Sequence, residues 1–200
     1  METVIAINKC QLSRKLFRYC FAVLLAMSAS LAFPVNAQQE EDVLQEEALI
    51  KSAFVFNFAK FTSWPEYTWD FNNTEFFLCT VGKDDVAKTL NGLTGELLNK
   101  RVVQVLNFDE DAVDNACNLV YIANDPSVNL AKFLKSHCCE SILTVSDIKG
   151  FALSGGMIEM YTDSKGSVQF KINRNRVILS GLNISSRLLS LAEIVKEEQP

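Results

Sequence analysis

The 200-residue chain contains a single histidine, His137, and it lacks the short glycine-rich and serine motifs of nucleotide-binding loops and hydrolases. His137 directly precedes Cys138 and Cys139, and neighbours in sequence seldom hold an imidazole and a thiolate within hydrogen-bonding reach. One histidine with two thiols also lacks the second pair of ligands that a zinc site needs. We therefore expect no enzyme activity, cofactor or metal, and a thiol enzyme at Cys138 or Cys139 is a remote alternative.

Positive charge is also scarce, since the chain has a formal net charge of −5. The first 37 residues hold four basic side chains and one acidic one, so without them the net charge falls from −5 to −8. An acidic domain is repelled by phosphate backbones and by anionic lipid surfaces. This charge excludes nucleic acid and a peripheral membrane surface as the main partners. No internal repeat or linker divides the rest of the chain into several domains.

Long hydrophobic runs are limited to one, residues 19–33, which is shorter than the roughly 20 residues of a membrane span. A basic segment precedes this run and small residues follow it, which is the order of a secretory signal peptide. We expect cleavage between Ala37 and Gln38, and a soluble protein outside the cytoplasm without a membrane anchor. The expected parts are a signal peptide (1–37), a disordered acidic segment (38–43), one domain (44–196) and a tail (197–200).

Cysteine is more plentiful than histidine, and four of the six cysteines follow the expected signal peptide: Cys79, Cys117, Cys138 and Cys139. An exported protein meets oxidant, so pairing is expected, and four cysteines allow three connectivities. A bond between the neighbours Cys138 and Cys139 would close a strained ring. Cys79 and Cys117 each lie in an apolar segment that resembles a strand start. We predict a disulfide between Cys79 and Cys117, and the pairing of the other two stays open.

Short apolar segments alternate with helical patterns along most of the chain. Strands are predicted at 76–81, 102–106, 119–123 and 142–145, and helices at 84–90 and 129–136. This alternation predicts a partly parallel sheet with covering helices. An antiparallel hairpin is predicted from 157–161 and 168–172, and a closing helix at 185–195. The expected fold is a single α/β domain with a mixed sheet of five to six strands.

The segment 44–63 is rich in phenylalanine and predicts an opening helix. Phe54, Phe58 and Phe61 fall on one face of it, which we expect to pack on the sheet. Phe56 lies roughly 200° around the helix from Phe54, and therefore points away from that face. The helix is thus mainly core, with an outward edge that could contact a partner or a second subunit; a helix that is core alone is the alternative. The candidate contact residues are Val55, Phe56 and Lys60.

A second candidate site lies at the start of the predicted closing helix. Its residues are Asn183, Ser185, Ser186 and Arg187. Free backbone N–H groups at a helix start attract anions, so a nucleotide or carboxylate ligand is one interpretation. Capping of the helix by Ser185 is the other.

Six segments together resemble the YfiR/HmsC-like periplasmic family, over about residues 44–195. They are ALIKSAFVFNFAKFTSWP, FFLCTVG, ACNLVYIA, ILTVSDIKGFALSGGMIEMY, VQFKINRN and SGLNISSRLLSLAEIV. The resemblance implies a non-catalytic periplasmic regulator of a Gram-negative bacterium. Such a regulator binds the periplasmic sensor domain of an inner-membrane diguanylate cyclase, represses it, and so lowers cyclic-di-GMP and biofilm formation. The pair Cys79–Cys117 fits the family's disulfide.

The sequence also departs from this family. Residues 151–161 lack the second cysteine pair of some relatives, and Arg174 and Arg176 stand where small apolar residues are usual. These departures leave the partner open. An accessory protein for another membrane receptor, such as a histidine kinase or an outer-membrane transporter, is the alternative, and a sensor of a small ligand is another. A homodimer is compatible with either.

Overall fold

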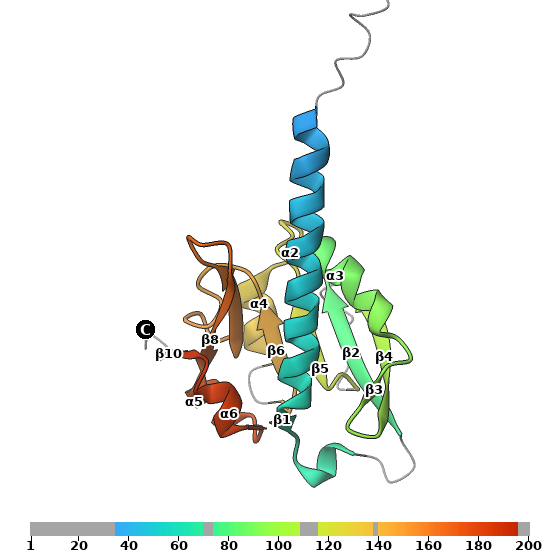
Figure 1. The fold of residues 1–200 in the computed structure, drawn as a ribbon. Helices are drawn as coiled ribbons and strands as arrows, with labels where there is room; N and C mark the ends of the chain where they lie inside the picture. The colour runs from blue at the N-terminus through green and yellow to red at the C-terminus, as the bar shows by residue number, and fades with distance from the viewer. Residues whose placement is uncertain (1–34, 70–73, 109–115, 138–139, 196–200) are drawn as a thin grey trace, which may run out of the picture. The chain divides into compact units, whose positions relative to one another are not determined.

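The computed structural model describes residues 35–69, 74–108, 116–137 and 140–195. The helices are α2 (Val35–Lys60), α3 (Asp85–Leu90), α4 (Leu130–Ser136), α5 (Arg174–Leu179) and α6 (Ser186–Leu189), with 3-10 turns η2 (Glu66–Thr68) and η3 (Asn91–Leu93). The strands are β1 (Thr62–Ser63), β2 (Glu75–Val81), β3 (Leu97–Leu98), β4 (Arg101–Phe108), β5 (Leu119–Ile122), β6 (Leu143–Ser146), β7 (Ile158–Thr162), β8 (Val168–Asn173), β9 (Asn183–Ile184) and β10 (Glu193–Val195) (Figure 1).

An eight-stranded sheet in the order β10-β8-β7-β6-β5-β2-β4-β3 forms the centre of the fold. The five strands from β4 to β7 in this order are parallel, β8 and β3 join them antiparallel, and β10 lies parallel to β8. This arrangement confirms the predicted mixed α/β fold. The count of five to six strands was too low because β3 and β10 have two and three residues, too few to show a periodic pattern.

Each face of the sheet carries its own hydrophobic cluster. Strand residues point to alternate faces, so Phe76 and Leu78 of β2 join the cluster under α2 and α3, whereas Cys79 and Val81 join the cluster under α4. The helices therefore cover both faces of the sheet, α2 and α3 on one and α4 on the other (Figure 1). Both faces being covered explains why the central parallel strands read as continuous apolar runs.

The opening helix α2 is longer than predicted at its start and shorter at its end. It begins at Val35 and includes residues 38–43, which the sequence predicted as disordered. Gln and Glu, which make up four of these six residues, are strong helix formers, and here their propensity outweighs the acidic composition. Residues from Val43 onward belong to the compact unit that contains the sheet. The expected cleavage site, Ala37–Gln38, lies within the helix, and cleavage there stays a prediction.

The helix ends at Lys60 because the next residues form a strand. Thr62 and Ser63 pair with Ile184 and Asn183 as the two-stranded sheet β1–β9. Among the described residues, no helix combines the length and the apolarity that crossing a membrane requires.

The buried stripe of α2 differs in phase from the predicted one. Phe58 is fully buried as expected, and its ring lies 4.9 Å from that of Phe170 in β8. Phe54 and Phe61 are only half-buried. Val55 is 0% exposed, so it belongs to the core and the prediction that it contacts a partner was wrong. The buried stripe is thus centred about one residue away from the predicted line of Phe54, Phe58 and Phe61. Ala48 and Ala59, which are small, also face the sheet and belong to this stripe.

The predicted closing helix at 185–195 was wrong. Helix α6 has only four residues, and Glu193–Val195 form the edge strand β10 beside β8. The apolar residues in this segment do recur at helical spacing, but backbone pairing with a strand distant in sequence overrides that local pattern.

The predicted disulfide between Cys79 and Cys117 is confirmed, with a distance of 5.9 Å between the two Cα atoms. It joins β2 to the residues just before β5, on the face that α4 covers. Asn118 strengthens the same junction, since its Oδ1 accepts a hydrogen bond of 2.8 Å from the backbone N–H of Phe77. The imidazole of His137 stacks on Phe133 at 4.4 Å. The predictions on Cys138 and Cys139 lie outside the described residues.

Candidate functional site

The order of the parallel strands creates a switch point between β2 and β5. The chain leaves β2 through α3 on one face of the sheet, and leaves the adjacent β5 through α4 on the other face. Along the sheet, the parallel strands run β4-β2-β5-β6-β7, so the first strand in sequence lies between the second and the third. Open α/β sheets with this order hold ligands in the crevice beyond the carboxyl ends of the two strands at the switch point.

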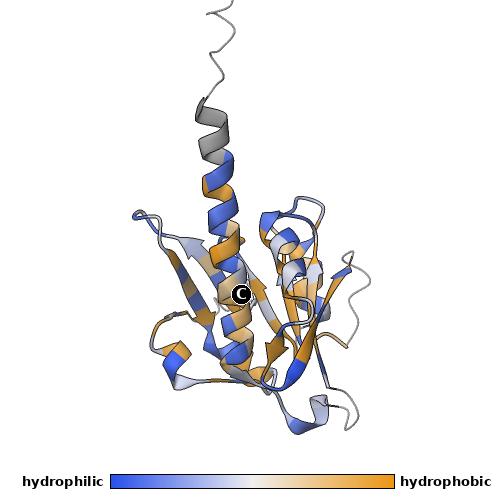
Figure 2. Ribbon diagram, turned by 45° about the vertical axis from the view of Figure 1, so that its right-hand side comes forward, coloured by the Kyte–Doolittle hydropathy of each residue, from blue (hydrophilic) through white to orange (hydrophobic). Residues whose placement is uncertain are grey.

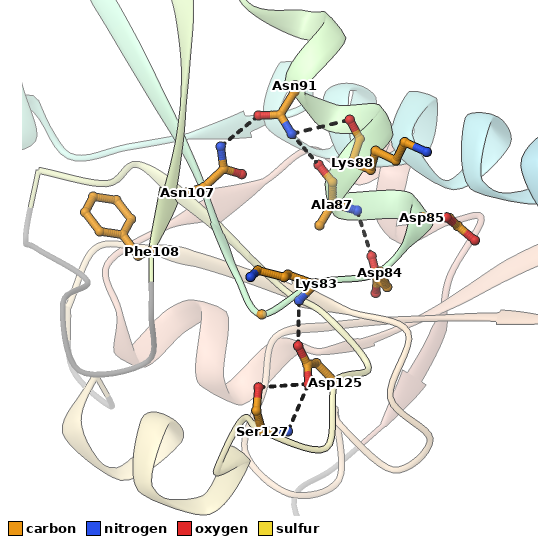
Figure 3. A pocket seen from close by; sticks show the side chains of 11 residues that line it. Lys83, Asp84, Asp85, Ala87, Lys88, Asn91, Asn107, Phe108, Asp125 and Ser127 are labelled. Carbon is orange, nitrogen blue, oxygen red and sulfur yellow. Dashed lines mark hydrogen bonds between the residues drawn. The ribbon is translucent and has the colours of Figure 1, made fainter.

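A cavity of about 870 Å³ lies at this switch point. Its walls come from the residues that follow β2 and β5, from α3, and from the end of β4 (Figure 3). The lining residues are Gly82, Lys83, Asp84, Asp85, Ala87, Lys88, Asn91, Asn107, Phe108, Asp125 and Ser127.

Gly82 allows the two loops of the switch point to approach each other. Its φ is +79°, and a Cβ atom at this position would lie 2.7 Å from Cγ2 of Val128 and 3.0 Å from Cβ of Asp125. Any other residue would therefore strain the backbone and push the loops apart. The next residue closes the junction, because the backbone N–H of Lys83 donates a 2.8 Å hydrogen bond to Asp125 Oδ2.

Asp84 uses both of its carboxylate oxygens within the protein. Oδ1 caps α3 by accepting a 2.7 Å hydrogen bond from the N–H of Ala87. Oδ2 accepts from the N–H of Asn124 at 3.0 Å and from the hydroxyl of Tyr121 at 2.9 Å. Asp84 is thus the N-cap residue of α3. The carboxylate therefore connects the start of α3 to the end of β5, and it holds these two walls of the cavity in place.

Asp125 has a similar structural role on the other loop. Its Oδ1 accepts hydrogen bonds from the backbone N–H and the hydroxyl of Ser127, at 2.9 and 2.8 Å. These bonds, together with the N–H of Lys83, hold the pKa of the Asp125 carboxyl below its usual value. The carboxylate is therefore ionised at neutral pH, and most of its hydrogen-bonding capacity serves the loop.

Two lysines and Asn107 are among the other polar residues of the cavity. In the described part of the chain, the ammonium groups of Lys83 and Lys88 make no hydrogen bond or ion pair. Asn107 is held in place, since its Nδ2 donates to Asn91 Oδ1 at 2.9 Å and its Oδ1 accepts from the Thr80 hydroxyl at 2.7 Å. Such ammonium and amide groups can bind a ligand.

A polar network also joins α2 to the carboxyl edge of the sheet. The Lys51 ammonium lies 2.7 Å from Asp147 Oδ2 and 2.8 Å from Glu47 Oε1. Glu47 Oε1 also accepts a 2.7 Å hydrogen bond from the Thr162 hydroxyl. Burial would lower the pKa of Lys51, but its bonds to Asp147 and Glu47 outweigh burial and raise that pKa. The hydrogen bonds from Lys51 and Thr162 lower the pKa of Glu47.

Tyr121 connects this network with the cavity. Its side chain is fully buried, and its hydroxyl interacts with both Asp84 and Asp147. Burial and these two carboxylates raise the pKa of Tyr121 strongly, so the phenol stays protonated. One phenol thus lies between a carboxylate that lines the cavity and a carboxylate that holds α2.

The outward residues of α2 remain candidates for a partner contact. Phe56 is half-buried and packs against the core with part of its ring, whereas Lys60 is exposed. Leu49 and Ile50 lie on the same side and are 60% and 40% exposed. We call this surface the outer face of α2. Hydrophobic and hydrophilic residues alternate along the helix as a whole (Figure 2). The residues of the outer face are Leu49, Ile50, Ala53, Phe56 and Lys60.

The second predicted site, from Asn183 to Arg187, lies in β9 and the start of α6. Ser185 caps α6, since its Oγ accepts a 3.3 Å hydrogen bond from the N–H of Leu188. Its own N–H donates to the carbonyl of Phe61 at 2.9 Å. The capping interpretation is therefore the one that the structure supports. Ligand binding by Asn183, Ser186 and Arg187 stays a prediction, and none of them lines the cavity at the switch point.

The cavity itself was missed from the sequence. Asp84 and Asp125 each follow a correctly predicted strand, which is the signal that could have indicated it. The predicted Cys79–Cys117 disulfide already implied that β2 and β5 are neighbours. The sequence does not say that α3 and α4 cover opposite faces of the sheet, which is what makes the junction of the two loops a switch point.

The strand order, with a cavity at its switch point, places the molecule in the class of doubly wound α/β domains. The YfiR/HmsC-like family matches residues 48–193, and the chain belongs to this family. The resemblance noted in the sequence is thus confirmed. No curated protein matches the chain. Membership suggests a periplasmic regulator of cyclic-di-GMP signalling, within a family of non-catalytic regulators.

Proposed function

We propose that this protein binds the periplasmic sensor domain of an inner-membrane diguanylate cyclase and represses it, which lowers cyclic-di-GMP and biofilm formation. The observation that carries the proposal is the match to the YfiR/HmsC-like family over residues 48–193. The match covers most of the compact unit Val43–Pro200 and every strand of the sheet except the end of β10.

The outer face of α2 is the contact surface in this proposal. A surface helix normally has one apolar stripe and one polar face. The core stripe of α2 is occupied by the sheet, yet Leu49, Ile50 and Phe56 add apolar surface on the other side. Exposed apolar residues that gather on one element mark interaction sites. Lys60 at the end of the same face supplies a positive charge for an acidic group of the partner.

The site of action requires export, and we propose that the mature protein is periplasmic and begins at Gln38. The basic segment, the apolar run and the small residues before Gln38 support this. Intact-mass measurement of protein from the periplasmic fraction would show a chain that starts at Gln38. A mass that includes residues 1–37 would contradict it.

The regulatory role is tested by deleting the gene in a strain that expresses the partner cyclase, and in the same strain without that cyclase. We expect cyclic-di-GMP to rise several-fold in the first strain and to stay unchanged in the second. An unchanged level in both strains would overturn the proposal and favour another membrane receptor as partner.

The contact surface is tested with Ala53→Arg, which places a long charged side chain on the outer face of α2. Ala131→Arg is the matched control, because Ala131 is an equally exposed alanine in α4 on the opposite face of the sheet. We expect Ala53→Arg to raise cyclic-di-GMP as the deletion does, with an unchanged melting temperature, and Ala131→Arg to behave as wild type. Equal behaviour of the two variants would exclude this face.

A further inference from the structure

We propose that the cavity at the switch point between β2 and β5 binds a small organic carboxylate with a flat apolar body. This site belongs to the domain itself and does not depend on which protein the domain binds. The proposal rests on the place of the cavity in the fold, on its volume, and on the charged and aromatic groups that remain free in its walls.

The place and the volume both suit a small molecule. Ligand cavities typically have volumes of about 300–1,000 Å³ and occur at the switch points of α/β sheets. The volume here, about 870 Å³, lies within that range. The walls of the cavity are also held in a defined position. Gly82 allows the two loops to make close contact, and hydrogen bonds to Asp84 and Asp125 join them.

The charges that remain free favour an anion. Asp84 and Asp125 each accept hydrogen bonds from backbone N–H groups, which offset part of their negative charge. The ammonium groups of Lys83 and Lys88 make no hydrogen bond or ion pair in the described part of the chain, although the charge of Lys83 also acts on the Asp125 carboxylate. Asp85 is the remaining carboxylate. Two ammonium groups without a hydrogen bond thus line the cavity, and they can donate to the oxygens of an anion.

The aromatic wall favours a flat ligand. Phe108 ends β4 and is half-buried, and its ring lines the cavity on the same side as the Lys83 ammonium (Figure 3). Asn107, on the same strand end, adds an amide held by Thr80 and Asn91. A planar body can stack on the Phe108 ring while its carboxylate reaches Lys83. A phosphate at the helix start is disfavoured, because the carboxylate of Asp84 already caps α3.

The test is an NMR titration of the ¹⁵N-labelled protein with benzoate, and with benzylammonium as a probe of similar shape and opposite charge. We expect benzoate to shift the amide signals of residues 82–85 and 107–108 with a dissociation constant of about 1–10 mM, the range for so small a ligand. Benzylammonium should leave these signals unshifted. If benzoate leaves them unshifted, or both probes shift them equally, the proposal is wrong.

Variants separate this site from general anion binding. The double variant Lys83→Gln/Lys88→Gln should weaken benzoate binding at least tenfold. The double variant Lys83→Arg/Lys88→Arg keeps both positive charges and should bind benzoate about as tightly as wild type. Lys149→Gln is the matched control, an exposed lysine outside the cavity, and should bind benzoate as wild type does. All variants replace exposed side chains, so their melting curves should coincide. Unchanged binding in the Gln double variant would overturn the assignment, whatever the protein's effect on cyclic-di-GMP.

Discussion

The two faces of the sheet are held in different ways. Under α2 and α3 lies the larger cluster, in which the ring of Phe58 packs on Phe170. Under α4 lies a smaller cluster, and here the Cys79–Cys117 disulfide ties β2 to the start of β5. The comparison teaches that noncovalent packing holds one face and a covalent bond reinforces the other. The two can therefore be weakened separately.

The largest effect is expected from Phe58→Ala, which removes the central ring of the α2 face. Phe58 is 0% exposed, and truncation of a buried phenylalanine costs about 3–5 kcal/mol of unfolding free energy. Urea denaturation under oxidising conditions measures it. Tyr67→Ala is the control, since Tyr67 is 81% exposed and its removal should cost far less. Equal losses for the two variants would show that α2 is not the main cover of this face.

Loss of the disulfide is expected to weaken the other face by a slightly smaller amount. Cys79 and Cys117 are 38 residues apart, and closing a loop of this length stabilises by about 3–4 kcal/mol in the chain-entropy account. The double variant Cys79→Ala/Cys117→Ala should lose this amount in urea denaturation. Reductant should destabilise the wild type and leave the double variant unchanged. Free labelling of both thiols in native protein would contradict the pairing.

A smaller effect is expected from Lys51→Met, which leaves Asp147 without its cation. A charged group left without its hydrogen-bonding partner costs about 1–3 kcal/mol when largely buried, and the Lys51 and Asp147 side chains are 11% and 14% exposed. The double variant Lys51→Met/Asp147→Leu should recover part of the loss, because no unpaired charge remains. If the single variant is as stable as wild type in urea, the ion pairs of Lys51 contribute nothing to the free energy of unfolding.

The smallest expected effect is the dependence of the protein's stability on pH through Glu47, which lies on α2. The pKa of Glu47 is lowered in the folded protein, chiefly by its bonds to Lys51 and Thr162. Its contribution to stability is therefore present above the unfolded value of 4.5 and is lost as the pH falls through the lower folded value. Glu47 is partly exposed, so this contribution stays below about 1 kcal/mol.

Urea midpoints measured from neutral pH down to about pH 3 should show this loss in wild type, and a flatter acid limb in Glu47→Gln. Two parallel acid limbs would mean that Glu47 does not contribute to the acid sensitivity of this face.

The sequence predicted the parallel centre of the sheet well because its strands are buried on both faces and read as continuous apolar runs. Glu75–Val81 and Leu119–Ile122 differ from their predicted bounds by one residue. Strand β10 was misread as helix, because pairing with β8 is a long-range contact that local spacing does not encode.

The same limit explains the two candidate sites. The outer face of α2 was found in part, since Phe56 and Lys60 follow from helical geometry alone. Val55 was misassigned because the phase of the stripe depends on how closely the helix approaches the sheet. The cavity was missed entirely, since it depends on which face of the sheet each connecting helix covers.

The hairpin between β3 and β4 lies within the loop of chain that the Cys79–Cys117 disulfide closes. Its two loop residues, Asn99 and Lys100, have φ angles of 48° and 74° and are exposed, as in the tight turns that join antiparallel strands. Lys100 is a cleavage point for trypsin and lies between Cys79 and Cys117. A chain cut there stays one covalent molecule, with both pieces joined through sulfur. A nicked protein would run intact on a non-reducing gel and separate into two fragments only after reduction.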